Sequence, residues 1–241
     1  GFLYGVDVVL NVNTDDTTNG DKVWATISSD SFGTLQLGDV GGAADNAGIG
    51  GENVLAGRAG FDGELGDVFD FGSTFLGTGN DPVSGGATKI SYYTPDINGF
   101  QLGVSFTPDA GAAGASFGEK DNNGSYEDVI SVGASYSAEL SGANISAAVT
   151  YEFGENEIAT NASAEALGVG ATATFGNYSI GVGYANFYDT GLTTADVSSG
   201  QDAGTWYSVG VGYAAASYNV SLGYYQATVG NGGSVGDSVS K

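Results

Sequence analysis

The sequence predicts an all-β protein whose strands form one antiparallel, up-and-down sheet. The first observation is a period-two alternation of apolar residues with small or polar residues, which recurs along most of the chain. The second is a regular alternation of short and long connections between these segments. The third is composition: the 241 residues include 43 glycines, 41% are apolar and only 14% are charged. These features predict strands with one apolar face and one polar face.

The alternation is clearest between residues 128 and 140, where Ile130, Val132 and Ala134 take every second position. A helical stripe would bury the small polar residues between them, so a helix is disfavoured there. The same pattern recurs in segments along the whole sequence. We expect eleven strands, at residues 2–13, 22–30, 34–39, 88–95, 100–108, 127–140, 144–154, 163–175, 178–188, 205–214 and 218–229.

The connections between the expected strands are alternately short and long. Short turns are expected at residues 31–33, 96–99, 141–143 and 176–177 and near 215–216. Their Gly, Asn and Asp residues supply the positive φ angles that tight hairpins need. Long polar connections are expected at residues 14–21, 40–87, 109–126, 155–162 and 189–204. An up-and-down sheet with this rhythm carries its turns on one rim and its loops on the other.

This asymmetry favours a transmembrane β-barrel. Such barrels cross the apolar layer in strands of about 9 to 11 residues, with short turns at one rim, long loops at the other and aromatic girdles at both interfaces. Tyrosine and phenylalanine gather at the expected strand ends, as in Tyr92, Tyr178 and Tyr218. The alternative is a soluble β-sandwich, in which the apolar face would be the core, but sandwiches rarely keep so regular a rhythm. No apolar run approaches the length of a transmembrane helix.

Composition excludes several classes of function. The chain has 28 acidic and 5 basic residues, a formal net charge of −23, and neither His nor Cys. So negative a surface repels phosphate backbones, and we expect no nucleic-acid partner. Thiolate or imidazole zinc sites, disulfides and Ser-His-Asp triads are unavailable, so we do not expect an enzyme. Carboxylate pairs acting as acid and base at a glycosidic bond are the weaker alternative.

Three segments carry a family resemblance. Residues 32–39 (FGTLQLGD), 89–95 (KISYYTP) and 99–106 (GFQLGVSF) resemble the strand before, and the hairpin after, the third loop of general bacterial outer-membrane porins of α-proteobacterial type. The resemblance implies one porin barrel domain over residues 1–241, in the outer membrane of a Gram-negative bacterium. It also implies that this chain forms about strands 3 to 13 of a 16-stranded barrel. We therefore expect two strands before residue 1 and three after residue 241.

The resemblance further implies that residues 40–87 fold into the barrel as a constriction loop. The residues expected at the pore constriction are Asp45, Glu52, Arg58, Asp62, Glu64, Asp67 and Asp70. A short helical turn is expected at residues 64–69. Lys89 is the expected cation of the barrel wall, because it shares a strand face with Ser91 and Tyr93. The alternative is an acidic loop that simply lies in solvent.

A narrow aqueous path lined by carboxylates concentrates cations. We therefore expect a channel for passive diffusion of small hydrophilic solutes and ions that prefers cations. It would be surrounded by outer-membrane lipid, and the resemblance implies a homotrimer. No cofactor is expected, although the acidic loops offer the oxygen ligands that Ca²⁺ takes, without spacing that identifies any ligand. The alternative is a secreted acidic β-rich surface protein, an adhesin or calcium-dependent β-roll, because residues 41–45 and 50–53 faintly echo a glycine-rich repeat.

Overall fold

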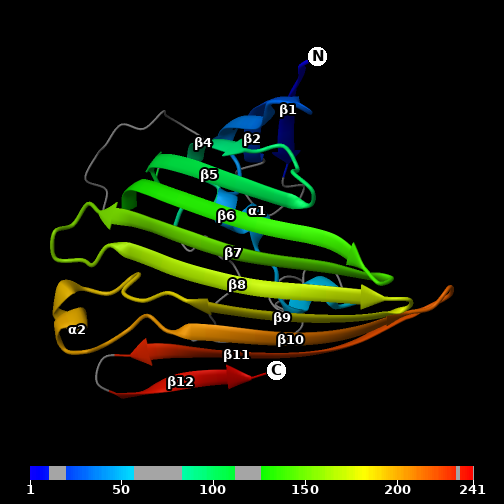
Figure 1. Cartoon of the computed structure of the whole chain (residues 1–241). Coiled ribbons are helices and arrows are strands. Elements are labelled where there is room, and N and C mark those ends of the chain that lie inside the picture. The colour runs from blue at the N-terminus through cyan, green and yellow to red at the C-terminus, as the bar shows by residue number, and fades with distance from the viewer. Residues whose placement is uncertain (11–19, 57–82, 112–125, 232–233, 241) are drawn as a thin grey trace.

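The computed structural model describes residues 1–10, 20–56, 83–111, 126–231 and 234–240. Over these residues the chain forms a single twelve-stranded sheet whose strands lie side by side in sequence order (Figure 1). The strands are β1 (Leu3–Leu10), β2 (Gly20–Ser29), β3 (Gly33–Asp39), β4 (Thr88–Tyr93), β5 (Phe100–Asp109), β6 (Tyr126–Leu140), β7 (Ala143–Asn156), β8 (Ala164–Phe175), β9 (Tyr178–Asn186), β10 (Thr205–Ala214), β11 (Asn219–Asn231) and β12 (Ser234–Ser240). The short helices in the described ranges are α1 (Ala43–Ala47), η1 (Gly51–Val54) and α2 (Thr194–Ser198).

The predicted antiparallel all-β sheet is confirmed, and each of the eleven expected strands has a counterpart. The structure adds β12, which the sequence analysis did not predict. Its segment Ser234–Ser240 holds only two apolar residues, Val235 and Val239, together with the charged Asp237. So weak an alternation does not mark a strand, and the segment is extended because it pairs with β11.

Two of the predicted short turns show why their residues were informative. At the β4–β5 turn, Asn98 and Gly99 have φ angles of 55° and 87°. At the β6–β7 turn, Ser141 and Gly142 have φ angles of 53° and 83°. Two successive positive φ angles are the signature of the type I′ turn, whose twist matches that of the strands it joins. These turns fix the register of both hairpins.

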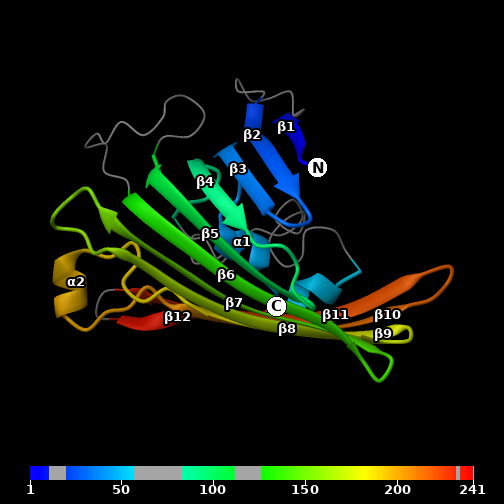
Figure 2. The same ribbon diagram turned by 45° about the horizontal axis from the view of Figure 1, so that its top comes forward.

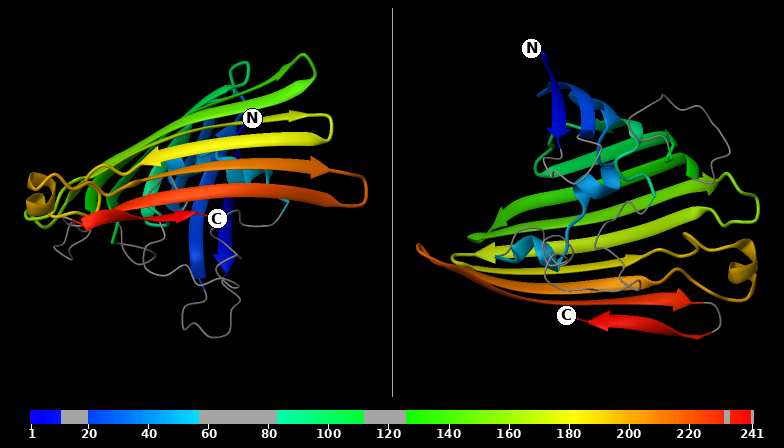
Figure 3. Two further views of the ribbon diagram at one scale, coloured as in Figure 1. Left: turned by 90° about the horizontal axis from the view of Figure 1, so that it is seen from below. Right: turned by 180° about the vertical axis from the view of Figure 1, so that it is seen from behind.

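The sheet is curled rather than flat. Strands β1–β3 rise steeply out of the plane of β7–β12, and α1 and η1 lie on the face toward which the sheet curls (Figures 2 and 3). We call this the inner face and the opposite one the outer face. The two edges of the sheet are β1 and β12, and no pairing joins them within the described residues. The described residues contain no helix that is long and apolar enough to cross a membrane.

The outer face is apolar and exposed. Val104, Val149, Val182 and Val211 are each between 43% and 45% exposed, and Leu222 is 74% exposed. The paired strands place these side chains on a common surface, as the register of Val182 with Val209 shows. A soluble monomer rarely exposes so extended an apolar surface. The apolar residues are therefore not the core of a sandwich, and they face outward as the barrel hypothesis predicts.

Tyrosines border this apolar surface on three successive strands. β9 carries Tyr178 and Tyr184, β10 carries Tyr207 and Tyr213, and the β11 hairpin carries Tyr218 and Tyr224. Each pair is six residues apart, or ~20 Å along an extended strand. Rings contact their neighbours within each row, for example Tyr178 with Tyr213 at a centroid distance of 4.9 Å. Two aromatic rows on either side of an apolar band are typical of the interfacial girdles of membrane barrels.

The outer face provides a test of its environment. We expect Val149→Lys to lower the free energy of unfolding in lipid vesicles by about 2–4 kcal/mol, because a lysine there would enter hydrocarbon. Urea titration of the vesicle-inserted protein measures this change. The matched control is Ser146→Lys, on the inner face of the same strand, which should be tolerated because its side chain leaves the sheet on the other side. Equal losses in both variants would contradict the assignment of the two faces.

Candidate functional site

The candidate site is the part of the β3–β4 connection that lies on the inner face. Its first leg, residues 40–56, contains α1 and η1, and its return leg, residues 83–87, leads into β4. α1 contacts β4 to β7, and η1 contacts β8 to β11 (Figure 3). The first leg therefore crosses most of the inner face, from one side of the sheet to the other. We call residues 40–56 and 83–87 the inner loop.

Glycines on the inner face allow the loop backbone to touch the sheet. A Cβ added to Gly133 would lie 2.4 Å from the carbonyl oxygen of Ala43. One added to Gly170 would lie 1.7 Å from the oxygen of Ile49, and one added to Gly210 would lie 2.0 Å from that of Gly51. No larger residue fits at these separations. The wall glycines in such contact with the backbone of the inner loop are Gly133, Gly170, Gly181, Gly183, Gly210 and Gly212.

Wall serines bind the backbone N–H groups of the inner loop. Ala43 and Ala44, in the first turn of α1, donate to the hydroxyl oxygens of Ser105 and Ser131 at 2.8 and 2.9 Å. These N–H groups have no partner within a helix, and the residue before α1 is Gly42, whose missing side chain cannot cap them. The sheet therefore supplies the cap.

The same arrangement recurs at η1. Gly51 donates its backbone N–H to Ser208 Oγ at 2.9 Å, and Ala56 donates to Ser221 Oγ at 2.7 Å. Leu55 packs against an inner cluster of buried apolar residues that includes Trp206. The first leg is thus hydrogen-bonded to β5, β6, β10 and β11, and its path follows the wall closely.

Glu152 of β7 holds the return leg. Its side chain is fully buried on the inner face. Oε1 accepts the backbone N–H groups of Val83 at 3.0 Å and Ser84 at 3.2 Å, and Oε2 accepts the Ser84 hydroxyl at 2.5 Å. A carboxylate accepts several hydrogen bonds and donates none, which suits a segment that presents only donors to it.

Lys89 of β4 binds the carbonyl groups of the same region. Its ammonium group donates to the carbonyl oxygens of Gly85 and Ala87, both at 2.7 Å, to that of Ser84 at 3.3 Å and to that of Val40. It lies on the inner face with Ser91, as expected, and is only 3% exposed. Lys89 therefore joins the two ends of the inner loop, and its charge is covered by them. The expected role of Lys89 as the cation of the barrel wall stays a prediction.

Two of the seven residues expected at the constriction lie in the described part of the loop. Asp45 is on α1 and exposed. Glu52 is on η1 and half-buried, and it accepts a hydrogen bond from Ser208 Oγ at 3.3 Å. The structure places them over different strands rather than in one cluster. The other five, Arg58, Asp62, Glu64, Asp67 and Asp70, and the helical turn expected at 64–69, lie outside the described residues.

Sequence reasoning missed Glu152 and the wall serines. Glu152 had a detectable signal, because it is a charged residue in the middle of a strand, on the same face as Thr150 and opposite Tyr151 and Phe153. A carboxylate at such a position needs a partner on that face. The serines and glycines had no individual signal, since both residue types fit any polar strand face.

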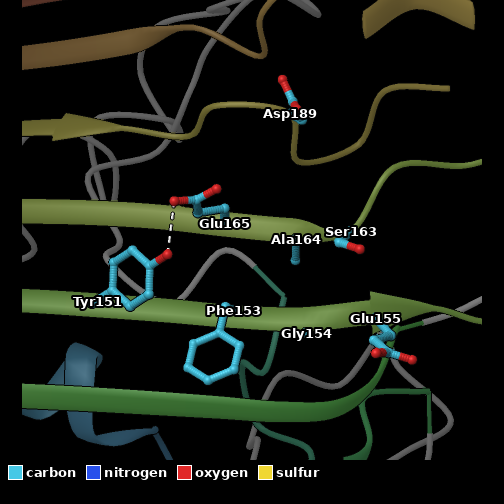
Figure 4. A pocket seen from close by; sticks show the side chains of 8 residues that line it. All are labelled: Tyr151, Phe153, Gly154, Glu155, Ser163, Ala164, Glu165 and Asp189. Atoms are coloured by element: carbon cyan, nitrogen blue, oxygen red, sulfur yellow. Dashed lines mark hydrogen bonds between the residues drawn. The ribbon is translucent and has the colours of Figure 1, made fainter. Parts of the chain in front are cut away.

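A separate hollow opens on the outer face, at the loop rim of β7 and β8 (Figure 4). It has a volume of about 540 Å³. Its lining residues are Tyr151, Phe153, Gly154, Glu155, Ser163, Ala164, Glu165 and Asp189. The Tyr151 hydroxyl donates to Glu165 Oε1 at 2.7 Å. Because Tyr151 and Phe153 belong to the outer face, this hollow is not part of the inner-loop site.

No group of three or more Asp, Glu, His or Cys side chains is arranged to hold a metal ion in the ranges that the structure covers. Of the acidic stretches considered for calcium, residues 15–16 and most of 119–128 lie outside those ranges, whereas 39–45 and 189–202 lie within them. Calcium binding in the loops therefore stays a prediction, and no ligand is assigned.

Comparison with known families agrees with this architecture. The family model described as Gram-negative porin matches residues 1–240. The chain belongs to the Gram-negative porin family. This membership assigns the porin to the outer membrane of a Gram-negative bacterium and to a family of channels rather than enzymes. It also argues against the alternative of a secreted acidic β-rich surface protein, an adhesin or calcium-dependent β-roll.

Individual relatives of the porin are distant. An uncharacterized protein of Rickettsia bellii (strain RML369-C) is 24% identical over 189 residues, which cover 59% of this chain and 43% of that protein. An anion-selective porin from Comamonas acidovorans has a TM-score of 0.55 at 18% identity, with 89% of this chain and 59% of that chain covered. The similarity to the Comamonas structure shows a common fold. The chain thus spans only about half the length of these two relatives.

A second similar structure is a triple mutant of the porin of Rh. blastica. It has a TM-score of 0.40 at 14% identity, with 100% of this chain and 83% of that chain covered.

The contact between Gly170 and the inner loop can be tested by adding one methyl group. We expect Gly170→Ala to push the loop off the wall, because the new Cβ would overlap the Ile49 carbonyl oxygen. The chain has no cysteine, so a single Ile49→Cys introduced as a reporter should react several-fold faster with a water-soluble thiol reagent. The control is Gly5→Ala, where a Cβ meets no atom within 4 Å. Unchanged labelling with Gly170→Ala would contradict the contact.

The anchoring role of Glu152 predicts a stability effect. Glu152→Ala removes the acceptor of three hydrogen bonds and should lower the free energy of unfolding by about 1–3 kcal/mol, because buried donors are left unpaired. Chemical denaturation followed by tryptophan fluorescence measures the loss. Glu155→Ala, an exposed carboxylate on the same strand, should have little effect. An equally small loss of unfolding free energy in both variants would refute the anchoring role of Glu152.

Proposed function

We propose that this porin chain forms the wall and constriction of a channel for passive diffusion of small hydrophilic solutes and ions. One observation carries the proposal: a loop is hydrogen-bonded to the polar inner face of a sheet whose outer face is apolar and exposed. An apolar exterior suits lipid, and a polar interior suits water. A loop held across that interior narrows the aqueous path.

The constriction loop is proposed to span residues 40–87, within one barrel domain of residues 1–241. Its two described ends support this extent, because buried side chains bind both to the inner face: Ser105 binds the first leg and Glu152 the return leg. Arg58, Asp62, Glu64, Asp67 and Asp70 are proposed to line the constriction together with Asp45 and Glu52. In the complete barrel, proposed to have 16 strands, this chain would supply most of the wall.

We propose that the channel prefers cations. The chain carries a net charge of −23. In the inner loop Asp45 is exposed, whereas the nearby positive charge of Lys89 is covered by four carbonyl groups. A path with uncompensated carboxylates concentrates counter-ions of positive charge. The anion selectivity of the Comamonas porin belongs to that protein, and a shared fold at 18% identity does not extend it to this chain.

The proposed assembly is a homotrimer embedded in outer-membrane lipid. The porin family is the basis of this part of the proposal. Part of the exposed apolar outer face can pack against neighbouring barrels, and the remainder can contact lipid.

The preference for cations is testable in a planar bilayer with a salt gradient. The reversal potential should show cation preference, and Asp45→Asn combined with Glu52→Gln should lower the cation-to-anion permeability ratio roughly twofold by removing charge from the path. The control, Asp196→Asn together with Asp202→Asn, removes the same charge beyond the inner loop, near α2, and should change the ratio less. A reversal potential showing anion preference in the unmodified protein would overturn the proposal.

A further inference from the structure

A cavity lies on the inner face beside η1, close to the rim of short turns. Its volume is about 260 Å³. One side consists of the inner-loop residues Asn53, Val54, Leu55 and Ala56, and the other consists of the turn-side ends of β8 to β11. The wall residues are Thr174, Gly176, Asn177, Ser179, Gly212, Tyr213, Ala214, Asn219 and Val220. The cavity is therefore a recess between the loop and the wall.

The cavity lining combines polar and apolar residues and carries no charge. Amides and hydroxyls come from Asn53, Asn177, Asn219, Thr174 and Ser179, and none of the thirteen lining residues is acidic or basic. The side chains of Asn177, Asn219 and Thr174 are exposed and make no hydrogen bond with any other residue in the described part of the chain. These groups offer both donors and acceptors to a bound molecule.

The absence of charge extends well beyond the cavity. Residues 166–188 and 203–236 contain no Asp, Glu, Lys or Arg, although the chain as a whole has 28 acidic residues. These segments include nearly all of β8 and the whole of β9, β10 and β11. These strands therefore place no charged side chain of their own beside the cavity. A ligand that suits it is neutral and hydrogen-bonding.

The loop side of the cavity is held firmly. The Ala56 N–H donates to Ser221 Oγ at 2.7 Å, and Gly51 is bound to Ser208. Gly212 approaches so closely that an added Cβ would lie 2.5 Å from the oxygen of Val54. A recess whose two sides are fixed relative to each other loses little freedom when a ligand binds.

We propose that this cavity is a subsite for a neutral polyhydroxyl compound of monosaccharide size. Hydroxyl groups both donate and accept hydrogen bonds, so they match the amides of Asn177 and Asn219 and the hydroxyls of Thr174 and Ser179. The volume is slightly below the range of about 300–1,000 Å³ typical of sites for drug-sized molecules, which favours a smaller compound. This inference rests on the proposed channel, because the ligand reaches the recess through the aqueous interior.

The probe is glucose, added to the short-turn side of the complete porin in a planar bilayer. The ion current should fall with glucose concentration in a saturable way, beyond the linear effect of glucose on bulk conductivity. Asn219→Leu should weaken the apparent affinity about fivefold or more, because hydrogen bonds to the sugar are lost. Asn144→Leu is the matched control: it removes an exposed amide from the same face and the same rim, on β7, outside the cavity lining. It should leave the affinity unchanged.

The outcomes separate the subsite from the channel. If ions pass but the current falls only in proportion to bulk conductivity, the subsite is refuted and the channel stands. Equal weakening by Asn219→Leu and Asn144→Leu would also refute the subsite, since the effect would belong to the rim as a whole. An absence of any ion current would refute the channel itself. The permeability ratio should be the same with and without Asn219→Leu, because no charge is removed.

Discussion

The structure depends on the pairing of backbone hydrogen-bonding groups where water is absent. In hydrocarbon an unpaired N–H or C=O group is costly, so a β-strand can cross only beside partners that satisfy it. The continuous antiparallel register from β1 to β12 provides this pairing between neighbours. It leaves the side chains free to differ on the two faces, with valine, leucine and tyrosine outside and glycine, serine and threonine inside.

The same requirement shapes the inner loop. Its helices are too short to satisfy their own ends, and their backbone groups are covered once the loop lies on the wall. Serines receive the N–H groups of the first leg, Glu152 receives those of the return leg, and Lys89 donates to the carbonyls of both ends. Glycines in the wall make these hydrogen bonds possible. Because a glycine has no side chain, the loop backbone can approach the strands closely enough to reach the neighbouring serine hydroxyls.

The strands were predictable from sequence because their signal is local. Alternation places every side chain on one of two faces, and turn residues such as Asn98 and Gly99 mark where a strand reverses. β12 was missed because its pairing with β11, rather than its own weak pattern, makes it extended. Within the site, Lys89 was predictable as an inner-face residue. Its carbonyl partners, the anchoring by Glu152 and the positions of α1 and η1 were not, because each depends on contacts between segments far apart in the sequence.

The anchors of the inner loop have a consequence for assembly. Ser208 and Ser221 follow their partners Gly51 and Ala56 by 157 and 165 residues. During synthesis and export the loop therefore emerges long before the strands that will bind it. Contacts of such long range form slowly, because a large chain segment must first be ordered. Until β10 and β11 join the sheet, the η1 end of the loop has no hydroxyl partners there, so that end can dock only after these two strands have formed.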